Sequence, residues 1–130
     1  MTLDHLYFCD GNEKKISWVI QDAETKFEQR RDHVENYLNK ISKEQSKYIA
    51  LHVGIFWAIG RFIIKNGDGV KIMLDLKSMY EHLTGKKQSH DHFIKSRVNF
   101  IKQIIVQRNL QAQFEIIEPS QNIATKLLSS

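Results

Sequence analysis

The stretch EKKISWVIQDAETKFEQRRDHVENYLNKI, from Glu13 to Ile41, carries the strongest pattern in the sequence and decides the predicted fold. Apolar residues recur along it at three- and four-residue steps, which is typical of an amphipathic α-helix. These positions are Ile16, Val19, Ile20, Ala23, Phe27, Val34, Tyr37, Leu38 and Ile41. We therefore predict one long helix over residues 13–41.

A second helix is predicted to follow directly. Ser42 and Gln45 have the spacing of a capping box, so we expect the chain to turn there and begin a new helix. The segment from Tyr48 to Ile64 is apolar on nearly all sides, although it contains His52 and Arg61. Because it is shorter than the ~20 apolar residues that a bilayer-spanning helix needs, we predict a helix buried in a bundle and no membrane contact.

The remainder of the chain gives weaker patterns. Residues 70–74 fit either a short strand or the first turns of a helix, and Asp75 and Ser89 are the expected caps of two further helices. Residues 110–116 alternate apolar and polar side chains, which predicts an edge strand that pairs with residues 70–74 or with the N-terminal segment.

These elements predict a mostly α-helical fold, organised as a single helical domain over residues 1–130. We expect a compact bundle built on the N-terminal helix hairpin, with the apolar helix buried at its centre. At most one small β-hairpin or edge-strand pair accompanies it.

Composition narrows the class of protein. The 130 residues carry a formal net charge of +4 and no dense block of lysine or arginine, so nucleic-acid binding is permitted but not indicated. The one cysteine, Cys9, and an N-terminus without the pattern of a signal peptide predict a cytoplasmic location. The sequence has no P-loop, Cys-x-x-Cys pair, dinucleotide fingerprint or H-E-x-x-H motif, so we predict no cofactor and no metal.

An acidic stripe on the predicted first helix is the leading candidate for a binding surface, and it consists of Glu24, Glu28, Asp32 and Glu35. Like charges four residues apart destabilise a helix by roughly 0.2–0.5 kcal/mol per pair, so a cationic partner is expected, either within the chain or on another protein. Trp18 lies opposite the apolar face, where it either anchors a partner or is covered by the N-terminal segment. The candidate partner-binding residues are Trp18, Asp22, Glu24, Glu28, Asp32 and Glu35.

The segment KKQSHDHF, from Lys86 to Phe93, is the main candidate for chemistry. In a helix His90 and His92 would point about 200° apart, so they cannot bind one metal ion together, and Asp91 suits a helix N-terminus. A ribonuclease that uses the two histidines as acid and base is the alternative. The candidate nucleic-acid or phosphate contacts are Lys86, Lys87, His90, His92, Lys95, Arg97 and Lys102.

One short segment resembles a known family. Residues 74–98 are similar in outline to the N-terminal module of phage antirepressors, over about a fifth of the chain, but the tryptophan of that pattern is absent. The matching positions are Leu76, Met79, Tyr80, Leu83, Phe93, Ile94, Lys95, Arg97 and Val98. The resemblance implies a regulatory role and assigns no family.

The function predicted from these patterns is that of a small bacterial protein-binding module without an enzymatic activity. Its most specific form is an inhibitor or immunity protein that neutralises a cognate toxin, such as a nuclease, whose basic surface would meet the acidic stripe. The first alternative is a nucleic-acid-binding or phage or plasmid regulatory protein. The second alternative is a histidine-dependent ribonuclease.

Overall fold

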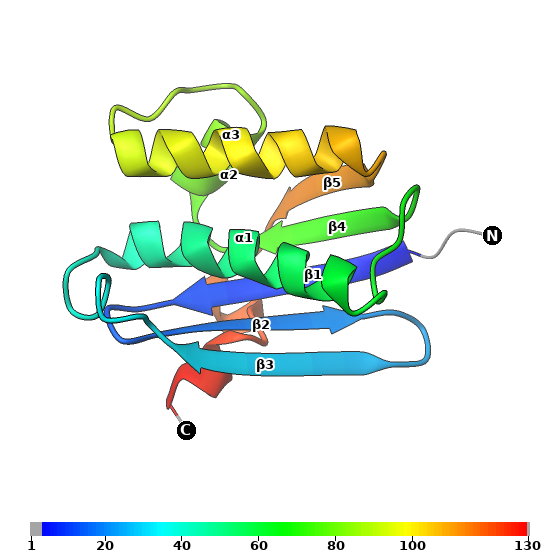
Figure 1. Ribbon diagram of the computed structural model, residues 1–130, viewed down its shortest axis with the longest axis horizontal. Coiled ribbons are helices and arrows are strands. Elements are labelled where there is room, and N and C mark those ends of the chain that lie inside the picture. Colours follow the sequence, from blue (N-terminus) through cyan, green and yellow to red (C-terminus); the bar gives the residue numbers. More distant parts are fainter. Residues whose placement is uncertain (1–3, 130) are drawn as a thin grey trace.

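The computed structural model describes residues 4–129 and contains a five-stranded sheet covered by helices (Figure 1). The elements are β1 (Asp4–Gly11), β2 (Lys15–Gln21), β3 (Lys26–Asp32), α1 (Lys43–Gly60), β4 (Gly69–Leu74), α2 (Lys77–Leu83), α3 (His92–Gln107), β5 (Gln111–Ile116), and the short 3₁₀ helices η1 (Pro119–Gln121) and η2 (Thr125–Ser129). The strand order is β3-β2-β1-β4-β5, with the first three strands antiparallel and β1, β4 and β5 parallel. The prediction of a mostly α-helical bundle is therefore wrong, and the fold is mixed α/β.

The predicted first helix is instead strand β2, a turn, strand β3 and a loop. Strand β2 is covered on both faces, with Ile16, Trp18 and Ile20 in the core beneath the helices and Val19 in a smaller cluster on the other face. A strand buried on both faces has no apolar–polar alternation, so its apolar residues can fall by coincidence at helical spacing. Strand β3 is exposed and charged, as suits an edge strand.

A turn closed by the Asn12 side chain precedes β2, and a turn closed by the Asp22 side chain follows it. The Oδ1 atoms of Asn12 and Asp22 each accept two backbone N–H groups, from the second and third residues ahead, all at 2.8 Å. At Asp22 these bonds stabilise the charged form and lower the pKa of its carboxyl group. Such side-chain turns are a local signal of a hairpin, and they interrupt the segment that periodicity assigned to a helix.

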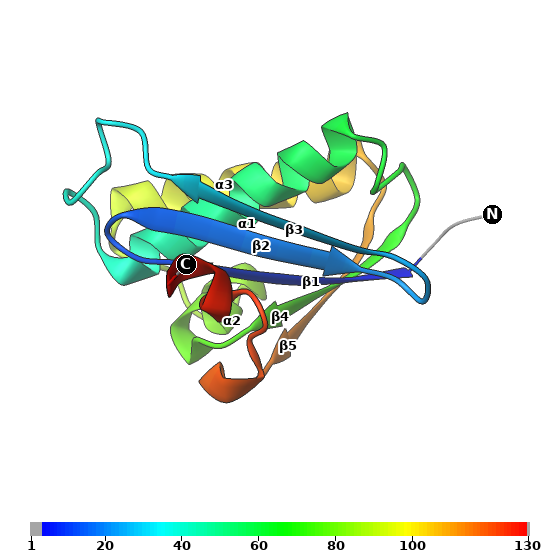
Figure 2. The ribbon, with the colours of Figure 1, turned by 90° about the horizontal axis from the view of Figure 1, so that it is seen from below.

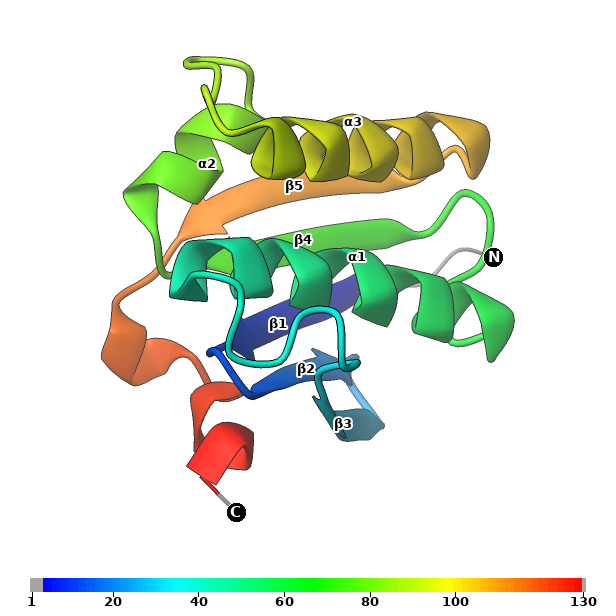
Figure 3. The same ribbon diagram turned by 60° about the vertical axis from the view of Figure 1, so that its left-hand side comes forward.

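Two layers cover the sheet on its opposite faces. Helices α1 and α3 lie side by side over one face (Figures 1 and 3), where the largest buried side chains include Trp18, Tyr7 and Tyr48. The C-terminal η2 segment lies against the other face, below β1 and β2 (Figure 2), where Ala124 packs with Phe8 and Val19. Because β1 and β2 are covered on both faces, they form the centre of the molecule.

Helix α1 confirms the predicted buried helix, although its neighbours differ from those expected. The capping box at Ser42 is formed, with Gln45 N–H donating to Ser42 Oγ at 3.0 Å. Gly54 allows close contact with the sheet, because a Cβ atom there would overlap the Tyr7 hydroxyl and lie 2.9 Å from the Trp18 ring. In the part of the chain from residue 4 to residue 129, no helix has the length and apolar character needed to cross a membrane.

The second half of the chain resolves the alternatives that the sequence left open. Residues 70–74 and 111–116 are strands, and they pair with each other as β4 and β5. Asp91 caps α3 by accepting from Phe93 N–H at 2.8 Å, so the cap is two residues later than the predicted Ser89. Asp75 does not cap α2, which leaves its carboxylate available for other contacts.

Candidate active site

Two aspartates lie where neighbouring parallel strands end. Asp10 is the penultimate residue of β1, and Asp75 directly follows β4. The chain continues from β1 to β2 on one side of this point, and from β4 by way of α2 and α3 to β5 on the other. In open α/β sheets, ligands bind outside the carboxyl ends of the strands where such connections diverge.

Lys47, from the first turns of α1, joins the two carboxylates. Its Nζ atom lies 2.6 Å from Asp10 Oδ1 and 2.9 Å from Asp75 Oδ1. All three side chains are largely buried, with exposed fractions of 13% for the lysine and 8% for each aspartate. Burial by itself would lower the pKa of Lys47, but hydrogen bonds and charge from the two aspartates outweigh it and raise the pKa. Lys47 is therefore a fixed ammonium ion and not a proton acceptor.

The other carboxylate oxygens are also engaged by protein donors. The Thr125 hydroxyl donates to Asp10 Oδ2 at 2.5 Å, and the amide of Asn122 donates to Asp75 Oδ2 at 2.9 Å. Asp10 Oδ1 also accepts the Gly11 backbone N–H at 2.8 Å. The C-terminal segment thus completes a centre in which each of the four carboxylate oxygens accepts at least one hydrogen bond.

A cavity of about 580 Å³ opens over this centre. Its lining combines the two aspartates and Lys47 with two more lysines, Lys43 from α1 and Lys126 from η2. Three ammonium groups and two carboxylates leave an excess of positive charge at the cavity, which favours an anionic ligand such as a phosphate group.

The residues present do not fit a resident divalent cation. Magnesium requires near-octahedral oxygen coordination at about 2.0–2.1 Å, whereas here the two facing carboxylate oxygens already bind an ammonium group. Among residues 4–129 there is no group of three or more histidine, cysteine, aspartate or glutamate side chains that could hold a metal ion.

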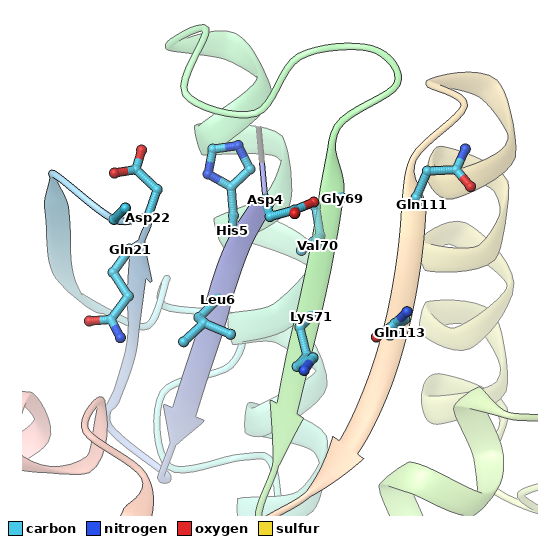
Figure 4. A pocket seen from close by; sticks show the side chains of 11 residues that line it. Asp4, His5, Leu6, Gln21, Asp22, Gly69, Val70, Lys71, Gln111 and Gln113 are labelled. Atoms are coloured by element: carbon cyan, nitrogen blue, oxygen red, sulfur yellow. The ribbon is translucent and has the colours of Figure 1, made fainter. Parts of the chain in front are cut away.

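A second cavity, of about 500 Å³, lies at the opposite ends of the same strands (Figure 4). Asp4 and His5 project there from β1, near Gly69 of β4. His5 Nε2 bonds Asp68 Oδ2 at 3.0 Å, and Asp68 also accepts the Lys65 backbone N–H at 2.9 Å. This buried pair fixes the loop before β4 to β1, so a structural role explains it.

The predicted partner-binding residues lie in different elements: strand β2, the turn that follows it, strand β3 and the loop after β3. Trp18 is fully buried against Trp57 and is not available as an interface anchor. Asp22 and Glu24 belong to the turn between β2 and β3, and the two acidic residues of β3 lie on the edge strand. All four residues of the predicted acidic stripe are exposed: Glu24, Glu28, Asp32 and Glu35.

Some of the residues predicted as alternative nucleic-acid contacts lie close together in the structure. Lys87, Lys95 and Lys102 line one small cavity of about 110 Å³ between α2 and α3, and Lys86 lies over the Tyr80 ring. His90 and His92 are exposed on either side of the α3 cap, and neither lines the cavity over Asp10. Arg97 on α3 bonds His52 on α1 and Tyr37 in the loop before α1, at 2.9 and 3.1 Å.

Sequence reasoning missed the carboxylate centre, although a local signal was present. Asp10 and Asp75 each end a short apolar run, LYFCD and IMLD, as expected for polar residues at the ends of buried strands. The sequence pattern places Asp75 as a helix cap, and Lys47 belongs to no motif in it. Asn122 and Thr125 carried no signal, because their role depends on the path of the C-terminal segment.

Comparison with solved structures identifies the fold. LC11-RNase H1, isolated from compost and solved in complex with an RNA/DNA hybrid, matches with a TM-score of 0.79 at 17% identity, over 95% of this chain and 93% of that one. The N-terminal RNase H domain of rv2228c from Mycobacterium tuberculosis matches with a TM-score of 0.72 at 12% identity, over 98% and 95%. RNase H1 from the archaeon Halobacterium salinarum matches with a TM-score of 0.69 at 12% identity, over 99% and 98%. No protein-family model matches the sequence, and no curated protein is similar to it in sequence.

These matches overturn the predicted function class. The inhibitor or immunity protein was inferred from a helical bundle with an acidic stripe, and the structure contains a five-stranded sheet in place of that bundle. The likeness to RNase H structures also conflicts with the expectation that the chain is not an enzyme, and none of these matches supports a basic toxin as partner. At these levels of identity the likeness establishes the architecture: the chain has the ribonuclease H fold.

Proposed function

We propose that this chain is a nuclease-type enzyme that acts on the RNA strand of an RNA/DNA duplex. Asp10 and Asp75 are the carboxylates of its reaction centre, and Lys47 is its cation. The observation that carries the proposal is the meeting of the two carboxylates at the carboxyl ends of β1 and β4. A fold shared with RNase H1 over nearly the whole chain supports it, as does the hybrid bound by LC11-RNase H1.

The centre contains the groups that phosphodiester hydrolysis requires. The attacking water must be oriented and lose a proton, and the negative charge that develops on the phosphate must be stabilised. Asp10 and Asp75 both line the cavity, and their carboxylates are its proton acceptors. The ammonium groups of Lys47, Lys43 and Lys126 supply positive charge at the same cavity.

A second contact surface fits a duplex that extends beyond the reaction centre. The lysines around the small cavity between α2 and α3 form a basic patch, defined as Lys87, Lys95 and Lys102. Lysine contacts to phosphate position a duplex without reading its sequence. We propose that this patch holds the backbone of one strand while the other strand reaches Asp10 and Asp75.

A cytoplasmic location is part of the proposal. Cys9 is the one cysteine of the sequence, and it is free and buried beside α1. Burial raises the pKa of its thiol, which makes it an unreactive core residue. An enzyme acting on RNA/DNA duplexes would find its substrate in the same compartment.

The test is cleavage of a labelled RNA/DNA hybrid by the purified full chain, with DNA/DNA and RNA/RNA duplexes of the same sequence in parallel. Each reaction is run once with a chelator and once with millimolar Mg²⁺. We expect cutting of the RNA strand in the hybrid. The variant Asp75→Asn should lose at least about 100-fold in rate, because it removes a carboxylate that no other residue replaces.

The matched control is Asp32→Asn, which makes the same chemical change on the exposed edge strand β3. It should cleave like the unaltered chain. Absence of RNA cleavage under both conditions would overturn the proposal. Equal cleavage by Asp75→Asn and the unaltered chain would also overturn it, since the activity would then come from a contaminant.

A further inference from the structure

Hydrolysis of phosphodiesters by carboxylate centres commonly depends on divalent cations held between the carboxylates. Such a cation needs free carboxylate oxygens at about 2.0–2.1 Å and several further oxygen ligands. The centre of Asp10 and Asp75 has the position for this role, because its two Oδ1 atoms face one common point. What occupies that point is the ammonium group of Lys47.

We propose that the Lys47 ammonium is the resident cation of this centre, and that it excludes Mg²⁺ and Mn²⁺ from the position between Asp10 and Asp75. The inference deepens the proposed function, since it names the cation of the same site. It rests on that proposal for its biological meaning, but it can be tested without any catalytic activity.

The bonding of the carboxylates supports this exclusion. Both oxygens that could bridge a metal ion accept hydrogen bonds from Lys47, at 2.6 and 2.9 Å. The outward oxygens accept from Thr125 and Asn122, so no oxygen of the pair is without a protein donor. A divalent cation would have to displace several tethered donors and would gain only two protein carboxylates.

The charge around the cavity acts in the same direction. Lys43 and Lys126 line the same cavity as Lys47, and a divalent cation would meet their repulsion in addition to that of Lys47. An anion meets the opposite field. An ammonium group has three N–H donors, and Lys47 uses two of them on the aspartates, so the third can bind a phosphate oxygen that enters the cavity.

The local chain explains why the lysine stays in place. Lys47 lies one turn into α1, behind the formed capping box at Ser42, so its backbone is fixed relative to the sheet. Asp10 lies on a strand paired on both sides, and Asn122 holds Asp75 while also donating to the Cys9 carbonyl oxygen at 2.9 Å. The lysine and both carboxylates are therefore held by independent elements, and the ammonium needs no rearrangement to bind.

The experiment titrates the purified full chain with MnCl₂ and MgCl₂, and measures the melting temperature and the binding heat by calorimetry. The unaltered chain should show no saturable binding heat and no rise in melting temperature at millimolar metal. The variant Lys47→Met keeps the length of the side chain and removes its charge, leaving two facing carboxylates without a counterion. It should melt at a lower temperature without metal and gain several degrees with Mn²⁺.

Two further variants make the result specific. Lys126→Met removes a lysine from the same cavity but not from the aspartates, and it should respond to metal no more than the unaltered chain. Lys47→Met combined with Asp10→Asn removes the site created by the first change, and it should lose the metal response. If Lys47→Met does not fold, Lys47→Gln takes its place with the same expectation.

Saturable Mn²⁺ binding by the unaltered chain that disappears in Asp75→Asn would overturn the inference, whatever the variants at position 47 do. A folded Lys47→Met or Lys47→Gln variant without a metal response would also overturn it, since the lysine would then not be what excludes the metal. Neither of these two outcomes depends on whether the protein cleaves an RNA/DNA hybrid. Failure of the proposed function, seen as absent RNA cleavage, is thus distinct from failure of this inference.

Discussion

The stability of the centre gives the sharpest quantitative prediction, for the variant Lys47→Met. The change leaves Asp10 and Asp75, each 8% exposed, with no cation between them. Removal of one partner from a buried ion pair costs about 3–5 kcal/mol, because an uncompensated charge stays buried. The hydrogen bonds from Thr125 and Asn122 remain, so we expect a loss of about 3 kcal/mol in the free energy of unfolding. For a chain of this length the loss corresponds to about 10 °C in melting temperature.

The measurement is urea unfolding at neutral pH, followed by the fluorescence of Trp18, which is buried, and Trp57, which is partly buried. In a double-mutant cycle with Asp75→Asn, the two losses should be less than additive by at least about 1 kcal/mol, since each variant removes the same interaction.

The pH dependence follows from the pKa of Lys47, which is raised above 10.5. The contribution of Lys47 to the unfolding free energy is therefore fully present below that pH and is lost as the pH rises through the folded-state pKa. The difference in unfolding free energy between the unaltered chain and Lys47→Met should therefore narrow as the pH rises into this alkaline range. A variant as stable as the unaltered chain at pH 7, or strictly additive losses, would refute the reasoning.

Three other predictions concern separate parts of the fold. Gly54→Ala should cost about 1–3 kcal/mol in unfolding free energy through overpacking against the sheet, whereas Gly60→Ala, with open space around its Cβ position, should cost little; urea unfolding compares them. Burial, with a neighbouring guanidinium, lowers the pKa of His52 from 6.5 to about 4, so the unfolded chain binds its proton more tightly and stability falls as the pH decreases between these values. After allowance for solvent screening we expect a loss of about 1–2 kcal/mol, absent in His52→Gln and measured as melting temperature against pH. Reversal of Lys95 and Lys102 to glutamate should weaken hybrid binding and reduce its salt dependence by about two units of slope; unchanged binding would remove the basic patch from the proposal.

The sequence was informative where a single local rule governs the structure. The capping box of Ser42, the buried helix that follows it and the strand after residue 110 all appear as predicted, since each depends on neighbours within a few residues. The hairpin of β2 and β3 was not predicted, because β2 is buried on both faces and so lacks the apolar–polar alternation that identifies a strand. The local signal of this hairpin lies in Asn12 and Asp22, whose side chains accept backbone N–H groups two and three residues ahead.

The site was beyond sequence reasoning for a different physical reason. Lys47 lies 37 residues from Asp10 and 28 from Asp75, and Thr125 lies 115 residues from Asp10. No spacing rule connects them, because their contact depends on two parallel strands and on a C-terminal segment returning to the sheet. The sequence does show the local setting of each residue: the two aspartates end apolar runs, and Lys47 lies in a predicted helix. Their convergence required the topology.

The electrostatic demand at the carboxyl ends of β1 and β4 can be met in two ways. Two facing carboxylates repel each other unless a cation lies between them, and either a dissociable metal ion or a tethered ammonium supplies that charge. A metal makes the charge depend on the metal concentration, whereas Lys47 makes it permanent and limits it to a single unit. Phosphate binding at this cavity should therefore survive a chelator and respond to salt. A metal-dependent centre on the same fold would lose binding or activity with the chelator, so this comparison distinguishes the two designs in a single assay.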